Sequence, residues 1–231
     1  MKVFAIGDLH LPGGDDDKSM EIFGSNWINH FERILDNWQK HIGDEDIVLI
    51  PGDISWAMTL NDAVFDLNTI GRLKGRKILL RGNHDFWWSA IGRVRALLPD
   101  GMYAIQNDSI SLGDFCFCGS RGWLCPGAAG YSETNDAHLY KREGQRLRLS
   151  LEHADKSKRI ICMMHYPPLA ENKRDTVFSI LMEEFGVEKV VYGHLHGRSR
   201  EVGIDGIRNG IEYHLCSSDH LNFCPRFIAE M

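Results

Sequence analysis

Residues 78–85 read Ile78-Leu79-Leu80-Arg81-Gly82-Asn83-His84-Asp85, an apolar run that leads directly into a polar block. The apolar run has the length and composition of a buried strand. Gly82 permits the sharp backbone turn that would aim the next side chains into a common site. Those side chains carry an amide, an imidazole and a carboxylate. In α/β sheets, ligands bind outside the carboxyl ends of the strands, so this junction predicts a functional edge.

The same arrangement recurs along the chain. Apolar strands are predicted over residues 3–6, 47–50, 160–164 and 190–192, and each runs into residues that can bind a metal. These residues are Asp8 and His10 after the first strand, Asp53 after the second, His165 after the third, and His194 and His196 after the fourth. Since the ends of such strands share one rim, all of these side chains are expected to converge there.

Longer amphipathic segments alternate with the strands, which favours an α/β fold. Helix starts are predicted at Ser25, at Asn61, after Asp85 and at Asp175, the last helix ending at Gly186. Another helix is predicted over residues 139–153, and another strand over residues 115–118. Two turn signals, Asp205-Gly206 and Asn209-Gly210, predict hairpin strands between residues 198 and 216.

Composition indicates a globular protein and limits its partners. The chain has 231 residues, 43% of them hydrophobic, and a net charge of -6. We expect one domain over residues 1–231. The acidic balance disfavours a nucleic-acid partner, and no apolar stretch has signal-peptide or membrane-spanning length. Six cysteines without a C-x-x-C pair indicate reduced thiols, so we expect a cytoplasmic protein with no membrane partner. The oligomeric state stays open.

The polar residues at the strand ends form a set too large for one ion. It contains two carboxylates, one amide and at least four imidazoles, which suits two ions that share a carboxylate. Mixed nitrogen and oxygen ligands favour manganese, iron or zinc over calcium or magnesium. A lone aspartate after a strand is usually a turn or cap residue, and a lone His165 would be a structural histidine. The recurrence at successive strand ends favours the metal-ligand interpretation.

These blocks resemble the calcineurin-like metallophosphoesterase family, whose pattern is D-x-H, G-D, G-N-H-D/E, a lone His and G-H-x-H. The matching residues occur in that order and extend from Asp8 to His196. The resemblance implies a two-sheet β-sandwich flanked by helices in four layers. It also implies that Asp8, His10 and His196 hold one ion, that Asn83, His165 and His194 hold the other, and that Asp53 bridges both.

The resemblance further implies that His84 contacts the phosphate and protonates the leaving oxygen. Two ions about 3.5–4 Å apart would lower the pKa of a shared water, and the bridging hydroxide would attack phosphorus in line. The expected activity is hydrolysis of a phosphomonoester or phosphodiester. The expected substrate is a small molecule, a nucleotide or a cyclic nucleotide, and a nucleic acid is disfavoured. The alternative is a non-catalytic metal-binding scaffold with the same fold. Retention of His84 and of every matched ligand favours the enzyme.

The chain departs from the protein phosphatase branch of the family in its second block. That branch has G-D-x-x-D-R-G, and its later Asp orients the catalytic histidine, whereas this chain has Trp56 at that position. A protein phosphatase is therefore disfavoured, and the group that orients His84 is left open. Substrate selection is expected from loops over residues 11–25 and 121–142. Within the second loop, Arg121 and Trp123 are candidates for phosphate and ring contacts.

Overall fold

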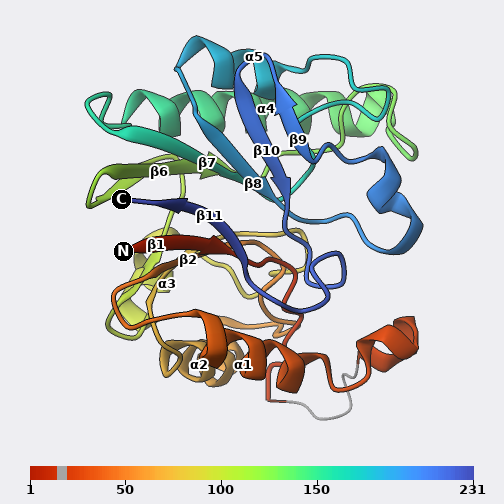
Figure 1. The fold of residues 1–231 in the computed structure, drawn as a ribbon. Coiled ribbons are helices and arrows are strands. Elements are labelled where there is room, and N and C mark those ends of the chain that lie inside the picture. The colour runs from red at the N-terminus through yellow and green to blue at the C-terminus, as the bar shows by residue number, and fades with distance from the viewer. Residues whose placement is uncertain (15–19) are drawn as a thin grey trace.

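The structure is a computed structural model that describes residues 1–14 and 20–231. Part of the predicted substrate loop over residues 11–25 therefore lies outside the described residues. The chain forms two mixed sheets that face each other in the middle of the molecule (Figure 1). Helices cover the outer face of each sheet. The expected α/β sandwich with four layers is confirmed.

The first sheet has the strand order β11-β1-β2-β3-β4. Strands β1 to β4 are parallel, and β11 closes the other edge by pairing antiparallel with β1. β1 runs toward the right-hand side of Figure 1, so its parallel neighbours end at the same edge. The strand bounds are β1 Lys2–Ala5, β2 Ile47–Pro51, β3 Arg76–Leu80, β4 Met102–Ala104 and β11 Arg226–Glu230.

The second sheet has the strand order β5-β6-β7-β8-β10-β9. Its four central strands are parallel, and the outer strands β5 and β9 are antiparallel to their neighbours. The predicted hairpin is confirmed as β9 and β10. The strand bounds are β5 Ser109–Leu112, β6 Phe115–Ser120, β7 Arg159–Met164, β8 Lys189–Tyr192, β9 Gly206–Arg208 and β10 Ile211–Leu215.

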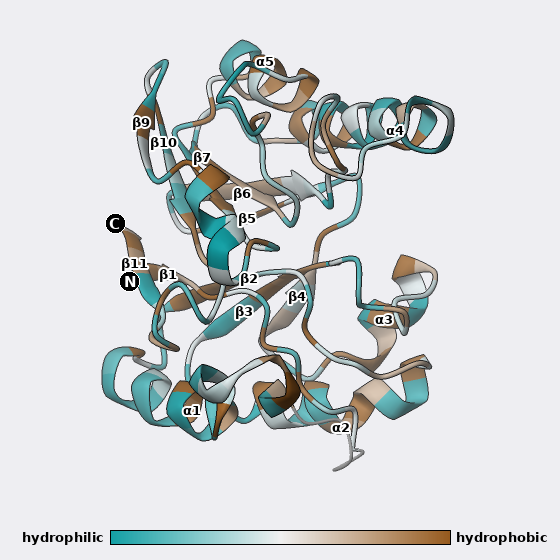
Figure 2. Cartoon of the chain, turned by 90° about the vertical axis from the view of Figure 1, so that its right-hand side faces the viewer, coloured by the Kyte–Doolittle hydropathy of each residue, from teal (hydrophilic) through white to brown (hydrophobic). Residues whose placement is uncertain are grey.

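Alternation along the strands divides the apolar side chains among three cores. Val3, Ile78 and Phe117 belong to the core between the two sheets. The residues next to them in the strands point outward and pack under the helices, as Phe4 does in the first sheet and Cys116 in the second. Because successive side chains of a strand face opposite ways, strands buried on both faces are apolar throughout. Figure 2 shows the result, with apolar strands inside and hydrophilic residues on the outer helices.

Five α-helices occur in the described residues. Helices α1 His30–His41, α2 Leu60–Gly71 and α3 Ile91–Leu97 accompany the first sheet, and α4 Glu133–Glu152 and α5 Val177–Glu184 cover the second. Short 3-10 turns span Met20–Phe23, Ser25–Trp27 and Gly197–Val202. Within the described residues, no helix has the length and apolar character needed to cross a bilayer.

The predicted helix caps at Ser25 and Asn61 are wrong. Ser25 begins only a 3-10 turn. The backbone of Ile28 is not helical, so this turn is separated from α1, which begins at His30. For α2 the cap is Thr59, whose side chain accepts the N–H of Asp62. Both errors concern where a helix begins, while the helices themselves are present.

The predicted starts of two further helices also shift. Thr176 caps α5 in place of Asp175, whose carboxylate pairs with Arg208 at 2.9 Å. After Asp85 the chain stays irregular until α3 begins at Ile91, because the Asp85 carboxylate accepts N–H groups from neighbouring loops instead of capping a helix.

The loop predicted over residues 121–142 is shorter than expected, because α4 already begins at Glu133. The hydrophobic period of α4 is weak in the sequence, because only one stripe of this helix is buried and the rest of its surface is polar. All six cysteines are free thiols, as expected.

Candidate functional site

The seven predicted ligands lie together where the carboxyl ends of both sheets meet. The first sheet contributes Asp8, His10, Asp53 and Asn83, and the second contributes His165, His194 and His196. Potential ligand atoms form two overlapping sets, Asp8 with His10 and His196, and Asp8 with Asp53 and His165. Within each set these atoms all lie within 4.8 Å of one another. Asp8, His10, Asp53 and His165 are buried.

The first group lies around Asp8. Its Oδ1 atom is 3.4 Å from His196 Nε2, and the backbone N–H of His194 donates to the same carboxylate at 3.1 Å. Asp8, His10 and His194 all have left-handed backbones, with φ of 56°, 47° and 72°. Such angles are sparsely populated by residues other than glycine, and they turn these side chains toward one point.

A second group of contacts centres on Asn83. Its Oδ1 atom lies 2.6 Å from His165 Nε2 and 2.9 Å from His194 Nδ1, and these two nitrogens are 3.3 Å apart. His165 Nδ1 faces the carbonyl of Pro51 at 3.0 Å, which favours a proton on Nδ1 and leaves Nε2 with a free lone pair. The lone pairs of Asn83 Oδ1 and of the two imidazole nitrogens point toward a common space, and a cation bound there would stabilise them.

Asp53 lies between the two groups. Its Oδ2 atom is 3.9 Å from His10 Nε2 and 3.5 Å from His165 Nε2, while its Oδ1 atom accepts the backbone N–H of His84 at 2.8 Å. Two glycines permit this placement. Gly52 has a φ of 95°, and a Cβ atom on Gly82 would overlap the backbone nitrogen of Asp53.

The electrostatics of the cluster favour cations. Burial lowers the pKa of both His10 and His194 to about 3, so both imidazoles are neutral at neutral pH and have a lone pair available for a metal. Burial, together with the charges of Asp8 and Asp85, raises the pKa of Asp53 well above its usual value. Divalent ions would supply the positive charge that these buried carboxylates lack, so the donor set fits the metals implied by the sequence.

His196 occupies a position where positive charge is favoured. Burial alone would lower its pKa, but Asp8 and Asp219 raise it to about 10. Asp219 Oδ1 lies 2.8 Å from His196 Nδ1, on the side of the ring opposite Asp8. Such carboxylate–histidine pairs orient metal-binding imidazoles. Asp219 was not identified from the sequence, because its contact with His196 is formed across 23 positions.

Asp85 is the second residue whose role was missed. It was recognised only as part of the Gly-Asn-His-Asp block, and the structure shows a buried carboxylate that fixes the loops carrying the ligands. It accepts N–H groups from Asp53, Ile54, Ser55, Gly82 and the indole of Trp87, at 2.7–3.2 Å. Asp85 therefore holds the loops after β2 and β3 in a fixed relative position.

His84 is half-buried beside the cluster, and Trp56 packs against it. The ring centroids of His84 and Trp56 are 4.6 Å apart, and Trp56 also stacks on His10 at 5.1 Å. An indole thus contacts the histidine at the position where the protein phosphatase branch has a carboxylate. Packing against Trp56 provides the orientation that the sequence left open.

The two candidate substrate contacts line separate cavities. Arg121 lies 4.6 Å over the ring of Trp123 and takes part in a small basic cavity. Trp123 donates its indole N–H to Asp136 and lines an apolar cavity that also includes His194. A third cavity, of about 350 Å³, lies beside His84 and His196 and is lined by aromatic residues that include Trp27 and Trp56.

The calcineurin-like phosphoesterase family model matches residues 1–198. The chain belongs to the calcineurin-like phosphoesterase family. Membership identifies it as a metal-dependent phosphoester hydrolase. The matched region includes every predicted ligand, while Asp219 lies beyond it.

Similar proteins agree with this family assignment. A probable cyclic nucleotide phosphodiesterase of Coxiella burnetii (strain RSA 493 / Nine Mile phase I) is 24% identical over 205 residues, which cover 85% of this chain and 76% of that protein. The phosphopantetheinyl hydrolase PptH of Mycobacterium tuberculosis has a similar structure, with a TM-score of 0.60, 14% identity, and coverage of 100% of this chain and 96% of the other. A protein of unknown function from Aquifex aeolicus gives a TM-score of 0.51 and 19% identity, covering 98% and 95%. The two solved structures support the fold of this phosphoesterase.

Proposed function

We propose that this phosphoesterase uses two divalent ions and that one domain over residues 1–231 carries the activity. Asp8, His10 and His196 would hold one ion, Asn83, His165 and His194 the other, and Asp53 both. The observation that carries the proposal is the place of Asp53 Oδ2, 3.9 Å from His10 Nε2 and 3.5 Å from His165 Nε2. Manganese, iron or zinc suits these mixed ligands.

When bound, the ions would polarise the phosphoryl group and acidify the attacking water. The chain's own residues then position the substrate and move a proton. His84 lies beside the ligands with its backbone fixed to Asp53 and its ring packed on Trp56. From there its imidazole would protonate the leaving oxygen as a general acid. Packing on Trp56 would restrict the rotation of this ring.

The substrate class follows from the surroundings of His84. The neighbouring cavity of about 350 Å³ has aromatic walls that suit a ring-bearing leaving group, such as a nucleoside. The relative named as a probable cyclic nucleotide phosphodiesterase supports the same class. We therefore propose a small phosphate ester, with nucleotides and cyclic nucleotides as the first candidates. Turnover of an aryl phosphate, its diester, nucleotides and cyclic nucleotides would separate monoesterase from diesterase activity.

Elemental analysis tests the number of ions. Protein that is stripped with a chelator and reconstituted with manganese should contain two ions per chain, and its activity should return with them. A non-catalytic scaffold would bind metal without turnover of any ester in the panel. A firm stoichiometry of one ion per chain in fully active protein would contradict the two-ion proposal.

Asp219 provides a test of one ion site alone. Asp219→Asn should weaken the ion held by His196 by about 10–100-fold, because the imidazole loses the charge that orients it. The ion held by Asn83 should be much less affected, and titration calorimetry with manganese resolves the two. Asp205→Asn is the matched control, since Asp205 pairs with His220 at 3.3 Å outside the cluster. Equal weakening of both ions would show that Asp219 acts on the fold and not on His196.

A further inference from the structure

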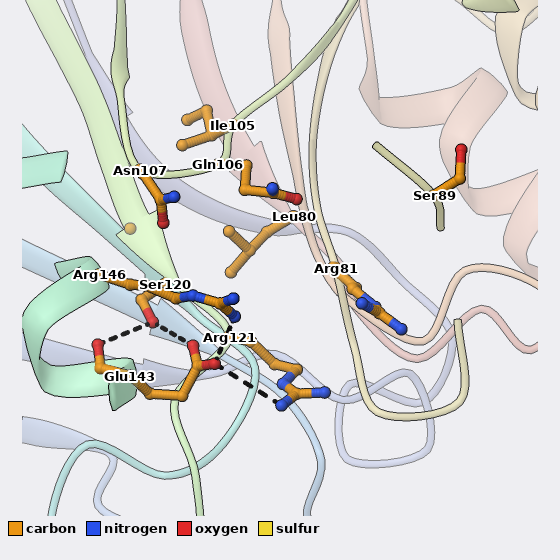
Figure 3. Close-up of a pocket in the computed structure, with 11 residues that line it drawn as sticks. Leu80, Arg81, Ser89, Ile105, Gln106, Asn107, Ser120, Arg121, Glu143 and Arg146 are labelled. Carbon is orange, nitrogen blue, oxygen red and sulfur yellow. Dashed lines mark hydrogen bonds and ion pairs between the residues drawn. The ribbon is translucent and has the colours of Figure 1, made fainter. Parts of the chain in front are cut away.

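A small basic cavity next to the ligand cluster has no role in the proposed mechanism. It has a volume of about 90 Å³, and Arg81, Arg121 and Arg146 contribute to its lining (Figure 3). These arginines come from the loop after β3, the loop after β6 and helix α4. Polar side chains, including Ser120 and Gln106, complete much of the wall. Three distant parts of the sequence thus place guanidinium groups around one space.

Positive charge exceeds negative charge in this lining. Glu143 is its carboxylate, with 1% of the side chain exposed, and it lies 2.7 Å from Arg146 Nη1 and 3.6 Å from Arg121 Nη2. The lining therefore contains one carboxylate and three guanidinium groups. Within the described part of the chain, the buried Nε atoms of Arg81 and Arg121 have no hydrogen-bond partner. Buried donors without an acceptor are costly, which points to a ligand that accepts hydrogen bonds.

The chemistry of the lining fits a phosphate group. A guanidinium presents N–H donors in a planar fork that matches the oxygens of phosphate. The side chain of Arg121 is 15% exposed and the Nε atom of Arg81 is buried, so both guanidinium groups are partly shielded from water. An anion with several acceptor oxygens would compensate these charges and pair with the unpartnered donors at the same time.

The cavity adjoins the residues proposed for the second ion. Arg81 stands two positions before Asn83, so their backbones are at most about 7 Å apart. The carbonyl of Arg121 accepts the backbone N–H groups of His165 at 3.2 Å and of Tyr166 at 2.9 Å. Rigid backbone thus connects two of the arginines to two ligands. The cavity therefore lies at the carboxyl ends of β3 and β6, the rim that also carries the proposed ligands.

We propose that the cavity lined by Arg81, Arg121 and Arg146 binds a phosphate group. The group is either a second phosphate on the substrate or free inorganic phosphate. Only the first source rests on the proposed function. In that case the enzyme would act on substrates that carry two separated phosphates. The second source would make the cavity a site for the inorganic ion beside the reaction centre.

Calorimetric titration with inorganic phosphate tests the cavity. The full chain is titrated in chelator, where ions cannot contribute, and again after loading with manganese. Arg146→Gln should weaken phosphate binding in chelator by about 10- to 100-fold, the effect of losing a charged hydrogen bond. Arg142→Gln is the matched control, because Arg142 also lies on α4 and contacts Glu143, at 3.9 Å, but does not line the cavity. It should bind phosphate as the wild type does.

Several outcomes would overturn the proposal. These are no phosphate binding by the wild type in chelator, equal binding by Arg146→Gln and the wild type, and equal losses in Arg146→Gln and Arg142→Gln. The last result would assign the effect to the pairing of Glu143. Thermal melts of both variants show whether either has lost its fold, and Arg146→Lys, which keeps the charge without the fork, should bind with intermediate affinity.

Kinetics on the manganese-loaded chain separates the two sources. Adenosine 3′,5′-bisphosphate and adenosine 5′-monophosphate differ by one phosphate. If the cavity takes a substrate phosphate, the wild type should prefer the bisphosphate in kcat/KM, and Arg146→Gln should lose that preference through a higher KM. If the ligand is inorganic phosphate, the preference should be the same in both proteins. Phosphate binding without any hydrolysis would contradict the proposed function and leave the phosphate site supported.

Discussion

Asp53→Asn should abolish phosphoesterase activity and weaken both ions together. The substitution removes the negative charge from the oxygen that lies between His10 and His165, so each ion loses a ligand. The loss should exceed the roughly 10–100-fold that follows removal of a residue behind a ligand. Asparagine keeps an oxygen that can accept the N–H of His84, so the loop should stay in place. Activity assays and manganese titration measure the two effects.

Asp175→Asn is the matched control for this change. Asp175 pairs with Arg208 at the surface at 2.9 Å, so the same loss of charge there should leave turnover and metal content unchanged. Near-normal turnover in Asp53→Asn would show that this carboxylate is not shared. Loss of only one ion would reassign it to that ion alone.

His84→Ala should keep its ions and lose activity in a way that depends on the leaving group. If the imidazole only donates a proton, alkyl esters should slow by about 10²–10⁴-fold. Nitrophenyl esters should slow less, because nitrophenolate leaves without protonation. Steady-state rates on matched alkyl and nitrophenyl esters, with metal analysis of the same sample, measure both quantities.

His220→Ala is the control for this prediction. His220 pairs with Asp205 outside the ligand cluster, so its removal should affect neither ester class. If His84→Ala slows both esters equally while the ions stay bound, His84 binds phosphate and does not donate the proton. Loss of the ions would place His84 among the ligands, contrary to the family pattern.

Apart from the β9–β10 hairpin, which its turn residues predicted, the strands that the sequence predicted are those buried on both faces. Strands β1, β2 and β3 read as continuous apolar runs because one side faces the other sheet and the other side faces helices. Strand β5 was missed, since its residues are mostly half-exposed and polar, as in Ser109 and Ser111. Strand β11 was missed because its pattern is short and irregular. Strand β11 also depends on a partner far away in the chain, because it pairs with β1.

Residues of the site were predictable where the neighbouring residues in the sequence indicate a strand end and a turn. A glycine before Asp53, Asn83 and His194 marks a turn, and the apolar run before it marks the strand end. The role of Asp219 was not predictable in the same way, because it depends on a contact with His196 formed across 23 positions. The packing of Trp56 on His84 was not predictable from local sequence either. Comparison with the family pattern showed only that position 56 lacks the carboxylate of the protein phosphatase branch.

The division of ligands between two sheets also sets an order for assembly during synthesis. All seven proposed ligands have been made once His196 leaves the ribosome, yet β10, the segment with Asp219 and β11 come later. The segment after β10 crosses to the first sheet, where Gly7 N–H donates to the Cys216 carbonyl at 2.7 Å and Ser218 N–H donates to the Gly7 carbonyl. β1 therefore lacks one neighbour until residues 226–230 are available. A nascent chain would hold every proposed ligand before it held the framework that fixes them, so the ion sites should mature only after residues 226–230 have been made.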